Sequence, residues 1–518
     1  DPADAFNTGH SSTSISAGLG MAQARELTGD NYYVVSVIGD GALTGGMAYE
    51  AMNNASRMKT NFIIVLNDNQ MSISENVGGM NQYLNSFRTS DAYLDLKDGV
   101  TNSLNRIPVV GERMVKRIRN AKSGIKQLFV PGMFFENMGI TYLGPVDGTN
   151  IKEIRKVLAE AKRVRGPVLV HVRTIKGEGY LPAERHPARF HGTGPFDIDT
   201  GVPLYHQEKA HYTDVFSTVM RKMGEREPKV VAITAAMADG TGLKRFKNLF
   251  PERFFDVGIA EEHAVTFAAG MAKAGLKPVF AVYSSFLQRA YDQVLHDVCA
   301  QNLPVVFAVD RAGLVGKDGA THQGIFDLSY LSSIPNLTVM APKNKWELSD
   351  MLKYAIAAEE PVAIRYPRGE ACDLWKDQRA PIQKGCAEVL AEGTYAALFA
   401  IGSMVETAWQ VRKKLAEKGI PTTVVNARFA MPLDKNCLRK LAESHPLLVT
   451  MEENVASGGF GEHVAAFLEE EALHTKVLRI AIPDCFVEHG SVGELKKALG
   501  LDADSVTEKI LAELPEEL

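Results

Sequence analysis

The sequence has little of several features, and each shortage excludes a class of protein. It contains only five cysteines, none in a CxxC pair: Cys299, Cys372, Cys386, Cys437 and Cys485. An odd, scattered set in a long chain predicts reduced thiols in a cytoplasmic protein, not a disulfide scaffold or a zinc site. The longest apolar runs, such as residues 395–401, are far too short to span a membrane. The formal net charge is only −5, so we expect neither nucleic acid nor a membrane as a partner.

The remaining composition is that of a globular protein, with 45% apolar and 23% charged residues. A chain of 518 residues is expected to hold about three domains. Segments typical of strands and of helices alternate almost throughout, which predicts mainly parallel sheets with helices on both faces. We therefore predict an α/β protein of three consecutive domains. Their predicted limits are residues 1–200, 205–379 and 381–518, and a segment rich in proline and glycine, 186–205, links the first two.

Apolar runs bounded by turn residues mark the predicted strands. In the first domain one strand ends at Gly39, and two others span 62–66 and 167–173. In the second domain the strands span 230–234, 255–259, 278–283, 304–309 and 361–366. In the third domain they span 395–401, 422–426, 447–451 and 477–482. A helix is predicted at 405–418. A segment rich in basic and polar residues, 86–127, includes a basic helical piece at 113–126. Such a helix can bind membranes or acidic partners, but a solvated helix or a lid is the favoured interpretation.

The most informative stretch runs from Val34 to Asn69. A strand ends in Gly39-Asp40-Gly41, a helix-length segment follows, and a second strand ends in Asn67-Asp68-Asn69. Ligands bind at the carboxyl edge of a parallel sheet, so both loops can bring an Asp carboxylate and an Asn carbonyl to one Mg²⁺. Glycine also lets the backbone come close to phosphate. A lone GDG is more often a simple turn, whereas the full unit resembles the signature of thiamine diphosphate (ThDP) enzymes.

Two other segments of the first domain carry polar groups next to predicted elements. Residues 8–14, Thr-Gly-His-Ser-Ser-Thr-Ser, open an apolar helix, where hydroxyl and free N–H groups suit an anion such as diphosphate. The alternative is a simple helix N-cap. Lys176 and His191 flank the segment 177–184 after a strand, which alone is a weak indication of function.

A helix of the second domain begins at Glu261-Glu262, after a predicted strand. Acids in a first turn are often matched to the helix dipole, and that interpretation suits Glu262. ThDP needs a carboxylate at a nitrogen of its pyrimidine ring, and Glu261 is the residue we assign to it. A carboxyl group at the edge of an apolar cleft retains its proton well enough for this task.

Further polar residues follow neighbouring strands of the second domain. The segment 310–324, DRAGLVGKDGATHQG, has four glycines and a dense set of polar groups, which suits a ligand loop. His322 could shuttle a proton or bind an anion. Arg311 and Arg368 would form a clamp for a substrate phosphate, because guanidinium groups bind phosphate oxygens bidentately. Phe286 could pack on the pyrimidine, although core packing is an equal alternative.

Together these motifs resemble the 1-deoxy-D-xylulose-5-phosphate synthases, a family of transketolase-like ThDP enzymes, over essentially the whole chain. The matching stretches are 6–22, 37–55, 66–74, 176–184, 256–265, 283–293, 310–324 and 365–369. The resemblance implies a role for each candidate residue. Asp40, Asn69 and the Met71 carbonyl would bind Mg²⁺, with Asn69 favoured over Asn67 by the family pattern. The diphosphate side would be lined by Gly9, His10, Ser11, Gly41, Ala42 and Lys176. The pyrimidine would be held by Ile259, Glu261 and Phe286, with Arg289 nearby. The acceptor aldehyde and its phosphate would face Tyr283, Arg311, Asp318, His322 and Arg368, and His191 would assist proton transfer.

The implied reaction is a decarboxylative condensation of pyruvate with D-glyceraldehyde 3-phosphate, a transferase step that supplies isoprenoid and thiamine synthesis. The resemblance also implies a homodimer. Transketolase or another ThDP-dependent ketol transferase is the alternative enzyme. Family members carry roughly a hundred residues before the FNTGHSS stretch at Phe6, and these supply further active-site groups. If that segment is missing, the first sheet loses an edge, so a truncated form with impaired activity is a second alternative.

Overall fold

The computed structural model describes residues 3–72, 76–85, 133–204 and 208–513, and it divides into two compact units. The first unit comprises Asp1–Tyr205 with Gly258–Ala260, and the second comprises His206–Val257 with Glu261–Leu518. The predicted basic helix at 113–126 lies outside the described residues.

The first unit is built on a four-stranded parallel sheet of order β1-β2-β4-β3. Its described elements, in chain order, are α1 (Ser14–Thr28), β1 (Val35–Gly39), η1 (Ala42–Thr44), α2 (Gly46–Ala55), β2 (Phe62–Asp68), α3 (Gly79–Asn85), α6 (Met133–Asn137), β3 (Thr141–Asp147), α7 (Ile151–Ala161), β4 (Pro167–Arg173) and α8 (Leu181–Arg185).

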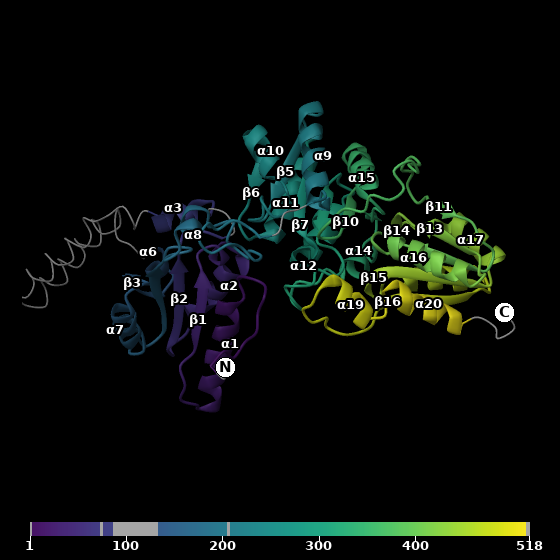
Figure 1. The fold of residues 1–518 in the computed structure, drawn as a ribbon. Helices are drawn as coiled ribbons and strands as arrows, with labels where there is room; N and C mark the ends of the chain where they lie inside the picture. Colours follow the sequence, from purple (N-terminus) through teal and green to yellow (C-terminus); the bar gives the residue numbers. More distant parts are fainter. Residues whose placement is uncertain (1–2, 73–75, 86–132, 205–207, 514–518) are drawn as a thin grey trace, which may run out of the picture. The chain divides into compact units, whose positions relative to one another are not determined.

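Helices cover both faces of this sheet, as Figure 1 shows. Alternate residues of β2 point to opposite faces, as the strand geometry requires. Phe62 and Ile64 pack with α1 and α2 residues in one apolar cluster, whereas Ile63 packs with Val157 of α7 in another. Because β2 is buried on both faces, its sequence reads as a continuous apolar run. This packing fixes the carboxyl ends of β1 and β2 side by side, and Asp40 and Asn69 follow them.

The second unit contains two sheets. The seven-stranded sheet has the order β14-β9-β10-β8-β7-β5-β6. Its elements are α9 (Tyr212–Arg226), β5 (Val230–Thr234), α10 (Lys244–Leu249), η2 (Pro251–Arg253), β6 (Phe254–Asp256), α11 (Glu261–Lys273), β7 (Lys277–Tyr283), α12 (Ser284–Leu287), η3 (Gln288–Ala290), α13 (Tyr291–Gln293), η4 (Val294–Cys299), β8 (Val306–Asp310), α14 (Asp327–Ser332), β9 (Thr338–Met340), α15 (Lys345–Ala357), β10 (Val362–Tyr366) and, from later in the chain, β14 (Phe429–Met431).

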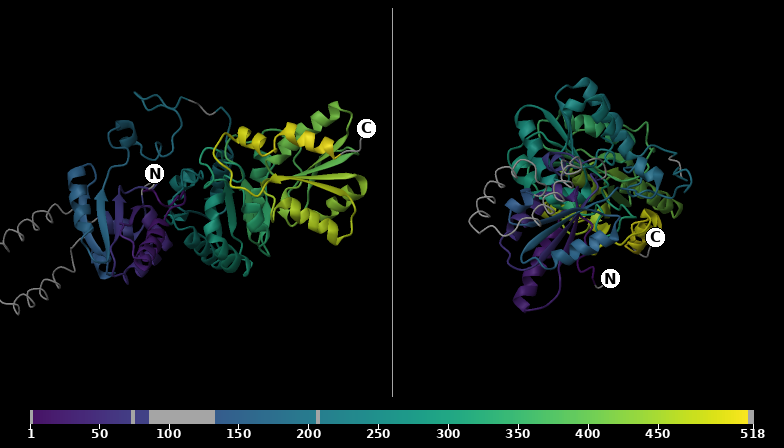
Figure 2. Two further views of the ribbon diagram at one scale, coloured as in Figure 1. Left: turned by 90° about the horizontal axis from the view of Figure 1, so that it is seen from below. Right: turned by 90° about the vertical axis from the view of Figure 1, so that its left-hand side faces the viewer.

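The five-stranded sheet has the order β11-β13-β12-β15-β16. Its elements are β11 (Glu388–Ala391), β12 (Ala396–Ala400), α16 (Met404–Glu417), β13 (Thr422–Asn426), α17 (Lys435–Ser444), β15 (Leu447–Val455), α18 (Phe460–Glu470), β16 (Lys476–Ile482), α19 (Val492–Ala498) and α20 (Ala503–Ala512). Helix α16 buries Val405, Ala408 and Val411 at helical spacing against β12 and β13. Helices lie on both faces of this sheet (Figure 2).

The predicted fold class, α/β with mainly parallel sheets, is confirmed. Strands β4, β5 and β13 have the predicted limits. The strand predicted at 255–259 is shorter, because β6 ends at Asp256 and Gly258 takes a positive φ of 76°. The structure adds β11 and β14, which pair antiparallel at sheet edges. The division into three domains at the stated limits stays a prediction.

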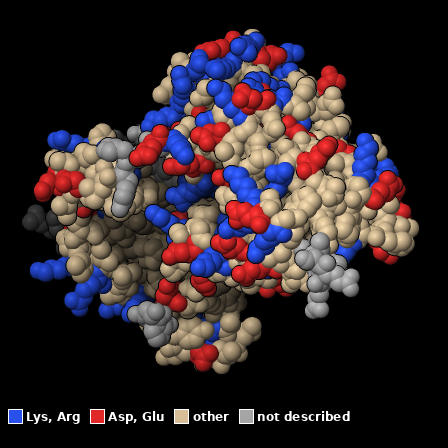
Figure 3. Space-filling view, turned by 45° about the vertical axis from the view of Figure 1, so that its right-hand side comes forward, with Lys and Arg blue, Asp and Glu red and all other residues tan. Residues whose placement is uncertain are grey.

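Two surface properties accompany this fold. No helix in the described part of the chain is long and apolar enough to cross a membrane. On the face drawn in Figure 3, basic and acidic side chains are interspersed.

Candidate active site

Asp40 is the central group of the first unit. It follows β1, and its side chain is only 3% exposed. Its Oδ2 accepts a hydrogen bond from Asn76 Nδ2 at 2.7 Å, and its Oδ1 accepts from the Asn69 backbone N–H at 3.4 Å. Asn76 was not predicted, because it lies seven residues beyond the Asn-Asp-Asn turn that follows the second strand. The two predicted loops do come together at this edge of the sheet.

Electrostatics at this edge favour a cation. Burial, and then the charge of nearby Asp68, raise the pKa of Asp40 to about 6. Two buried carboxyl groups side by side repel each other when ionised, and a divalent cation would remove that cost. The donor set of carboxylate, amide and backbone oxygens is the type that Mg²⁺ takes in proteins.

The structure separates the roles of the two asparagines. The Asn67 side-chain carbonyl accepts a hydrogen bond from Thr174 Oγ1 at 2.7 Å, which ties β2 to the end of β4. The Asn69 side-chain carbonyl instead accepts a hydrogen bond from the Met71 backbone N–H at 3.1 Å, within the loop itself. Asn69 and Met71 therefore belong to the loop beside Asp40, whereas Asn67 serves the sheet.

A chain of hydrogen-bonded side chains beside Asp40 was not predicted. Asp68 Oδ2 lies 3.0 Å from His171 Nε2, and His171 Nδ1 lies 2.7 Å from the Tyr142 hydroxyl. The three residues come from β2, β4 and β3 and so link neighbouring strands. Only the parallel pairing of these strands brings them together, and a single polar residue within an apolar strand gives no such signal.

The segment from Gly9 to Ser12 packs against the start of the GDG loop. Ser12 Oγ donates to the Ala42 carbonyl at 2.7 Å, and a Cβ on Gly45 would lie 2.4 Å from that Oγ. Helix α1 begins at Ser14, and its N-cap Thr13 makes no side-chain capping bond. His10 and Ser11 are half-buried. The predicted diphosphate residues Gly9, His10, Ser11, Gly41 and Ala42 thus occupy adjoining segments.

A Cβ on Gly41 would lie 2.8 Å from Ser72 Cβ, so only glycine allows the two loops to approach this closely. Lys176 Nζ donates to the Ser72 carbonyl. Desolvation lowers the pKa of Lys176, and the charge of Asp40 opposes that shift. Desolvation, and then the charge of Lys176, lower the pKa of His191. Lys176 and His191 therefore join the Asp40 cluster.

Gly258–Ala260, although late in the sequence, belongs to this same unit. The Ile259 backbone N–H donates to Thr44 Oγ1 at 2.9 Å, and Thr44 Oγ1 donates to the Gly41 carbonyl at 2.6 Å. Ile259 is thus placed beside the GDG loop. Thr44 was not predicted, because its partner is 215 residues away.

Glu261 is the first residue of α11 in the second unit, and it is 2% exposed. Its Oε2 is buried and has no hydrogen-bond partner, and Arg289 Nη1 lies 3.7 Å away. Burial raises the pKa of Glu261 to about 7, because desolvation outweighs the Arg289 charge. A buried carboxyl oxygen without a partner costs stability, which is typical of a group reserved for a ligand.

An aromatic row lies elsewhere in this unit. The Tyr283 and Phe286 rings stack with centroids 5.6 Å apart, and the His322 ring meets Phe286 edge-on at 5.5 Å. Burial raises the pKa of Tyr283 to about 12, and desolvation lowers the pKa of His322. Phe286 is half-buried in this row, so it is not an ordinary core side chain.

The two predicted clamp residues converge on one acid. Arg311 Nη1 lies 3.8 Å and Arg368 Nη1 lies 3.3 Å from Asp318 Oδ2. The Arg311 guanidinium also lies over the Tyr283 ring, 3.8 Å from its centroid. The Asp318 carboxylate lies between two guanidinium groups, where a bound anion would lie. The geometry therefore fits a phosphate clamp.

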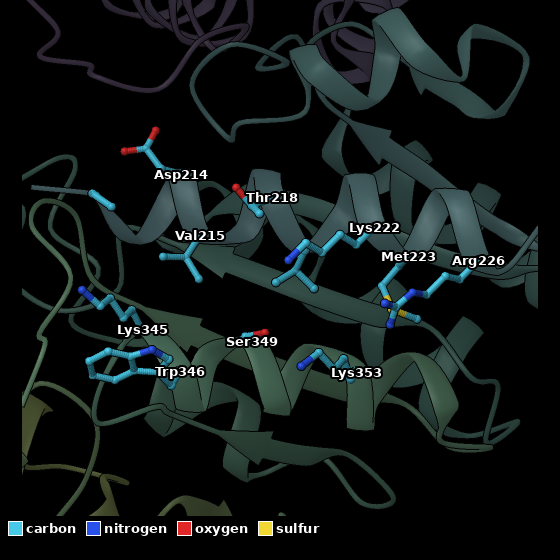
Figure 4. A pocket seen from close by; sticks show the side chains of 12 residues that line it. Asp214, Val215, Thr218, Lys222, Met223, Arg226, Lys345, Trp346, Ser349 and Lys353 are labelled. Atoms are coloured by element: carbon cyan, nitrogen blue, oxygen red, sulfur yellow. The ribbon is translucent and has the colours of Figure 1, made fainter. Parts of the chain in front are cut away.

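A separate cavity of about 380 Å³ lies between α9 and α15. Figure 4 shows its labelled residues, including Lys222 and Arg226 from α9 and Lys353 from α15. None of the predicted site residues lines it. The chemistry-bearing groups therefore lie in the two clusters described above, around Asp40 in the first unit and around Glu261 and Arg311 in the second.

Comparisons with known proteins find family models that match three stretches of the chain. Residues 1–174 match the family model described as 1-deoxy-D-xylulose-5-phosphate synthase, residues 208–372 the transketolase pyrimidine binding domain, and residues 385–506 the transketolase C-terminal domain. The 1-deoxy-D-xylulose-5-phosphate synthase of Lachnoclostridium phytofermentans is 57% identical over 98% of this chain and 81% of its own. The enzymes of the same name from Caldanaerobacter subterraneus and Clostridium tetani are each 52% identical over 98% of this chain and 82% of their own.

Two solved structures have a similar fold. A split-gene transketolase, titled an inactive beta4 tetramer, aligns with a TM-score of 0.54 and 29% identity over 59% of this chain and 98% of its own. The transketolase of Campylobacter jejuni aligns with a TM-score of 0.52 over 98% of this chain and 82% of its own, at 18% identity. The second likeness concerns the fold alone.

Proposed function

This chain belongs to the 1-deoxy-D-xylulose-5-phosphate synthase family, and on that premise we propose that it condenses pyruvate with D-glyceraldehyde 3-phosphate. The products are 1-deoxy-D-xylulose 5-phosphate and CO₂. The observation that carries the proposal is the state of Glu261, whose buried Oε2 has no hydrogen-bond partner and whose pKa is raised to about 7. A carboxyl group in this state can share a proton with a heterocyclic nitrogen at neutral pH.

The residues of the second unit fit the pyrimidine half of ThDP. When bound, ThDP supplies an electron sink for the charge left on the pyruvate carbonyl carbon as CO₂ leaves. Glu261 would hold a proton at the pyrimidine nitrogen, and Arg289 would keep the carboxyl group oriented. Phe286 would contact the ring and so exclude water from it.

The residues of the first unit fit a diphosphate with its metal ion. Asp40, Asn69 and the Met71 carbonyl would bind Mg²⁺, which relieves the repulsion between the Asp40 and Asp68 carboxylates. Lys176 would neutralise diphosphate charge. The adjoining segments around Gly9, His10, Ser11, Gly41 and Ala42 would line the phosphate oxygens with small side chains and backbone N–H groups.

The Arg311 cluster would bind the acceptor. Arg311 and Arg368 would take the phosphate in place of Asp318, and Tyr283 would back the Arg311 guanidinium. Asp318 and His322 would then face the acceptor hydroxyl and aldehyde groups. Desolvation lowers the pKa of both His322 and His191, which favours the neutral imidazole that can accept a proton. A homodimer in the cytoplasm that feeds isoprenoid and thiamine synthesis completes the proposal.

A donor comparison tests this function against its alternative. The transketolase models matched by residues 208–372 and 385–506 make a ketol transferase the second candidate. We expect the purified protein, with ThDP and Mg²⁺, to release CO₂ from pyruvate when D-glyceraldehyde 3-phosphate is added. Turnover of a ketose phosphate donor, with no CO₂ from pyruvate, would replace the proposed function with the alternative.

A further inference from the structure

The loop that carries the clamp residues is held by a strand from the five-stranded sheet. This loop, residues 311–324, follows β8 of the seven-stranded sheet. Glu453 lies on β15 and is 2% exposed. Its Oε1 accepts a hydrogen bond from the Leu314 backbone N–H at 2.9 Å. A buried carboxylate oxygen on a backbone N–H forms one of the stronger hydrogen bonds in proteins.

The other carboxylate oxygen of Glu453 is held by residues outside the loop. Ser403 Oγ donates to Oε2, and Lys496 Nζ lies 3.5 Å from it. The side chain therefore has a hydroxyl and an ammonium group to satisfy its charge without the loop. The bond to Leu314 is an additional one, and it sets the position of the loop backbone.

Gly313 of the loop packs closely against the Glu453 side chain. A Cβ on Gly313 would lie 2.9 Å from Glu453 Cδ, and Gly313 has a positive φ of 79°. Gly313 and Gly324 pair with each other through both backbone bonds, at 2.6 and 2.8 Å. We call this Gly313–Gly324 pair the neck of the loop, and the hydrogen bond at Leu314 lies directly beside it.

The apolar residues beside the neck bury themselves in the same sheet. Leu314 is 2% exposed and Ile325 is 1% exposed, and both belong to the apolar cluster of the five-stranded sheet. The Val455 backbone N–H donates to the Ile325 carbonyl at 2.9 Å. Strand β15 therefore forms hydrogen bonds at both ends of the loop. Arg311, Asp318 and His322 of this loop lie at the phosphate clamp.

From this geometry we propose that Glu453 is a positioning residue for the phosphate clamp. Through Leu314, it sets where Arg311 and Asp318 stand relative to Arg368 and so tunes the selection of phosphorylated acceptors. The inference rests on the proposed function for its acceptor, but a binding measurement tests it without turnover.

Two substitutions separate the reach of the side chain from its charge. Glu453→Asp keeps the charge beside Lys496 but withdraws the carboxylate by about 1.5 Å, beyond hydrogen-bond distance of Leu314. Glu453→Gln loses the charge but keeps an acceptor oxygen at full length. A role for the charge alone would make Glu453→Gln the damaging change, whereas positioning makes Glu453→Asp the damaging one.

A matched control stands next to it in the strand. Glu452 is also buried, but its carboxylate accepts from the Phe460 and Gly461 backbone N–H groups, at 2.8 and 2.7 Å, at the start of α18. Glu452→Gln therefore disturbs β15 without touching the loop neck.

The experiment measures the Kd of glycerol 3-phosphate by calorimetry on the ThDP- and Mg²⁺-loaded protein and its variants. A second readout is the ratio of kcat/KM for D-glyceraldehyde 3-phosphate to that for D-glyceraldehyde, which lacks the phosphate. We expect Glu453→Asp to weaken binding and lower the ratio about tenfold, with Glu453→Gln and Glu452→Gln within about twofold of the parent.

The inference is overturned if Glu453→Asp retains the parent Kd, or if Glu453→Gln or Glu452→Gln loses as much as Glu453→Asp. A parent that binds glycerol 3-phosphate but forms no product would refute the proposed function and leave the positioning role standing. A parent that binds no glycerol 3-phosphate would refute the positioning role, whereas product formed by that parent would leave the proposed function standing.

Discussion

Glu261 and Glu262 are consecutive acids in the first turn of α11, and they differ in their surroundings. Glu261 is buried with an oxygen that lacks a hydrogen bond, whereas Glu262 is only half-buried. We expect Glu261→Ala to lower kcat by at least about 10³-fold while the far-ultraviolet circular dichroism spectrum stays unchanged. Glu262→Ala, the matched control, removes an acid from the same helix turn and should retain most of the parent kcat. Near-normal turnover of Glu261→Ala would remove Glu261 from its assigned role.

Asn67 and Asn69 form a second pair that the structure separates. Asn69 lies in the loop beside Asp40, and the Asn67 carbonyl is taken by Thr174. We expect Asn69→Ala to raise the Mg²⁺ concentration needed for half-maximal activity by at least about tenfold, since one oxygen ligand is lost. Asn67→Ala should cost stability, by roughly 1 kcal/mol, and leave the Mg²⁺ requirement close to that of the parent. The opposite order in a Mg²⁺ titration would make Asn67 the ligand.

For single residues, the sequence predicts polar side chains that stand directly after a strand or at the start of a helix. Asp40, Asn69 and Glu261 each follow a strand or begin a helix, and the structure places each in a polar cluster. Asn76, Thr44 and the Asp68–His171 pair were missed because their partners lie 36, 215 and 103 residues away. Such contacts arise from strand order and loop packing, which no local pattern encodes.

Strand β15 shows how one element serves two purposes. Consecutive acids at its end, Glu452 and Glu453, point to different partners, the start of α18 and the neck of loop 311–324. The register of β15 is irregular between Met451 and Val455, the stretch that contains both acids. The prediction of a strand at 447–451 found the element but stopped before these acids, because charged residues rarely continue a buried strand.

Glu452 also makes a pH-dependent contribution to stability. Burial raises its pKa from an ordinary 4.5 to about 7. Between these values the folded protein holds a proton that the unfolded chain has released, so this contribution is present below pH 4.5 and is lost as the pH rises through 7. We expect the unfolding free energy of Glu452→Gln to rise relative to the parent between pH 4.5 and 8, by at most about 3 kcal/mol. Urea denaturation at several pH values measures it, and a difference that does not change with pH would contradict it.

Among the described strands, β3 (Thr141–Asp147), which contains Gly144-Pro145, and three short strands escaped prediction. Strands β9, β11 and β14 have only three or four residues each, and β11 and β14 pair antiparallel with their neighbours. A run this short has too few residues to show alternation. The long central strands were predicted because parallel strands buried on both faces read as continuous apolar runs.

On the scale of the whole molecule, the alternation of strands and helices was enough to predict the class of fold. It was not enough to predict which sheets share a compact unit. Strand β14 leaves the sequence of the third predicted domain to pair with β9 of the second, and Glu453 extends that connection to loop 311–324. The chain therefore joins its clamp residues to the five-stranded sheet, a relation visible only in three dimensions.

The central claim is that this chain makes a carbon–carbon bond between pyruvate and D-glyceraldehyde 3-phosphate. The most direct measurement follows [2-¹³C]pyruvate by NMR in the presence of D-glyceraldehyde 3-phosphate, ThDP and Mg²⁺. We predict a labelled ketone carbon in 1-deoxy-D-xylulose 5-phosphate, with one CO₂ released for each molecule formed and no product without Mg²⁺. Label that remains in pyruvate, while a ketose phosphate donor is consumed by the same preparation, would contradict the account.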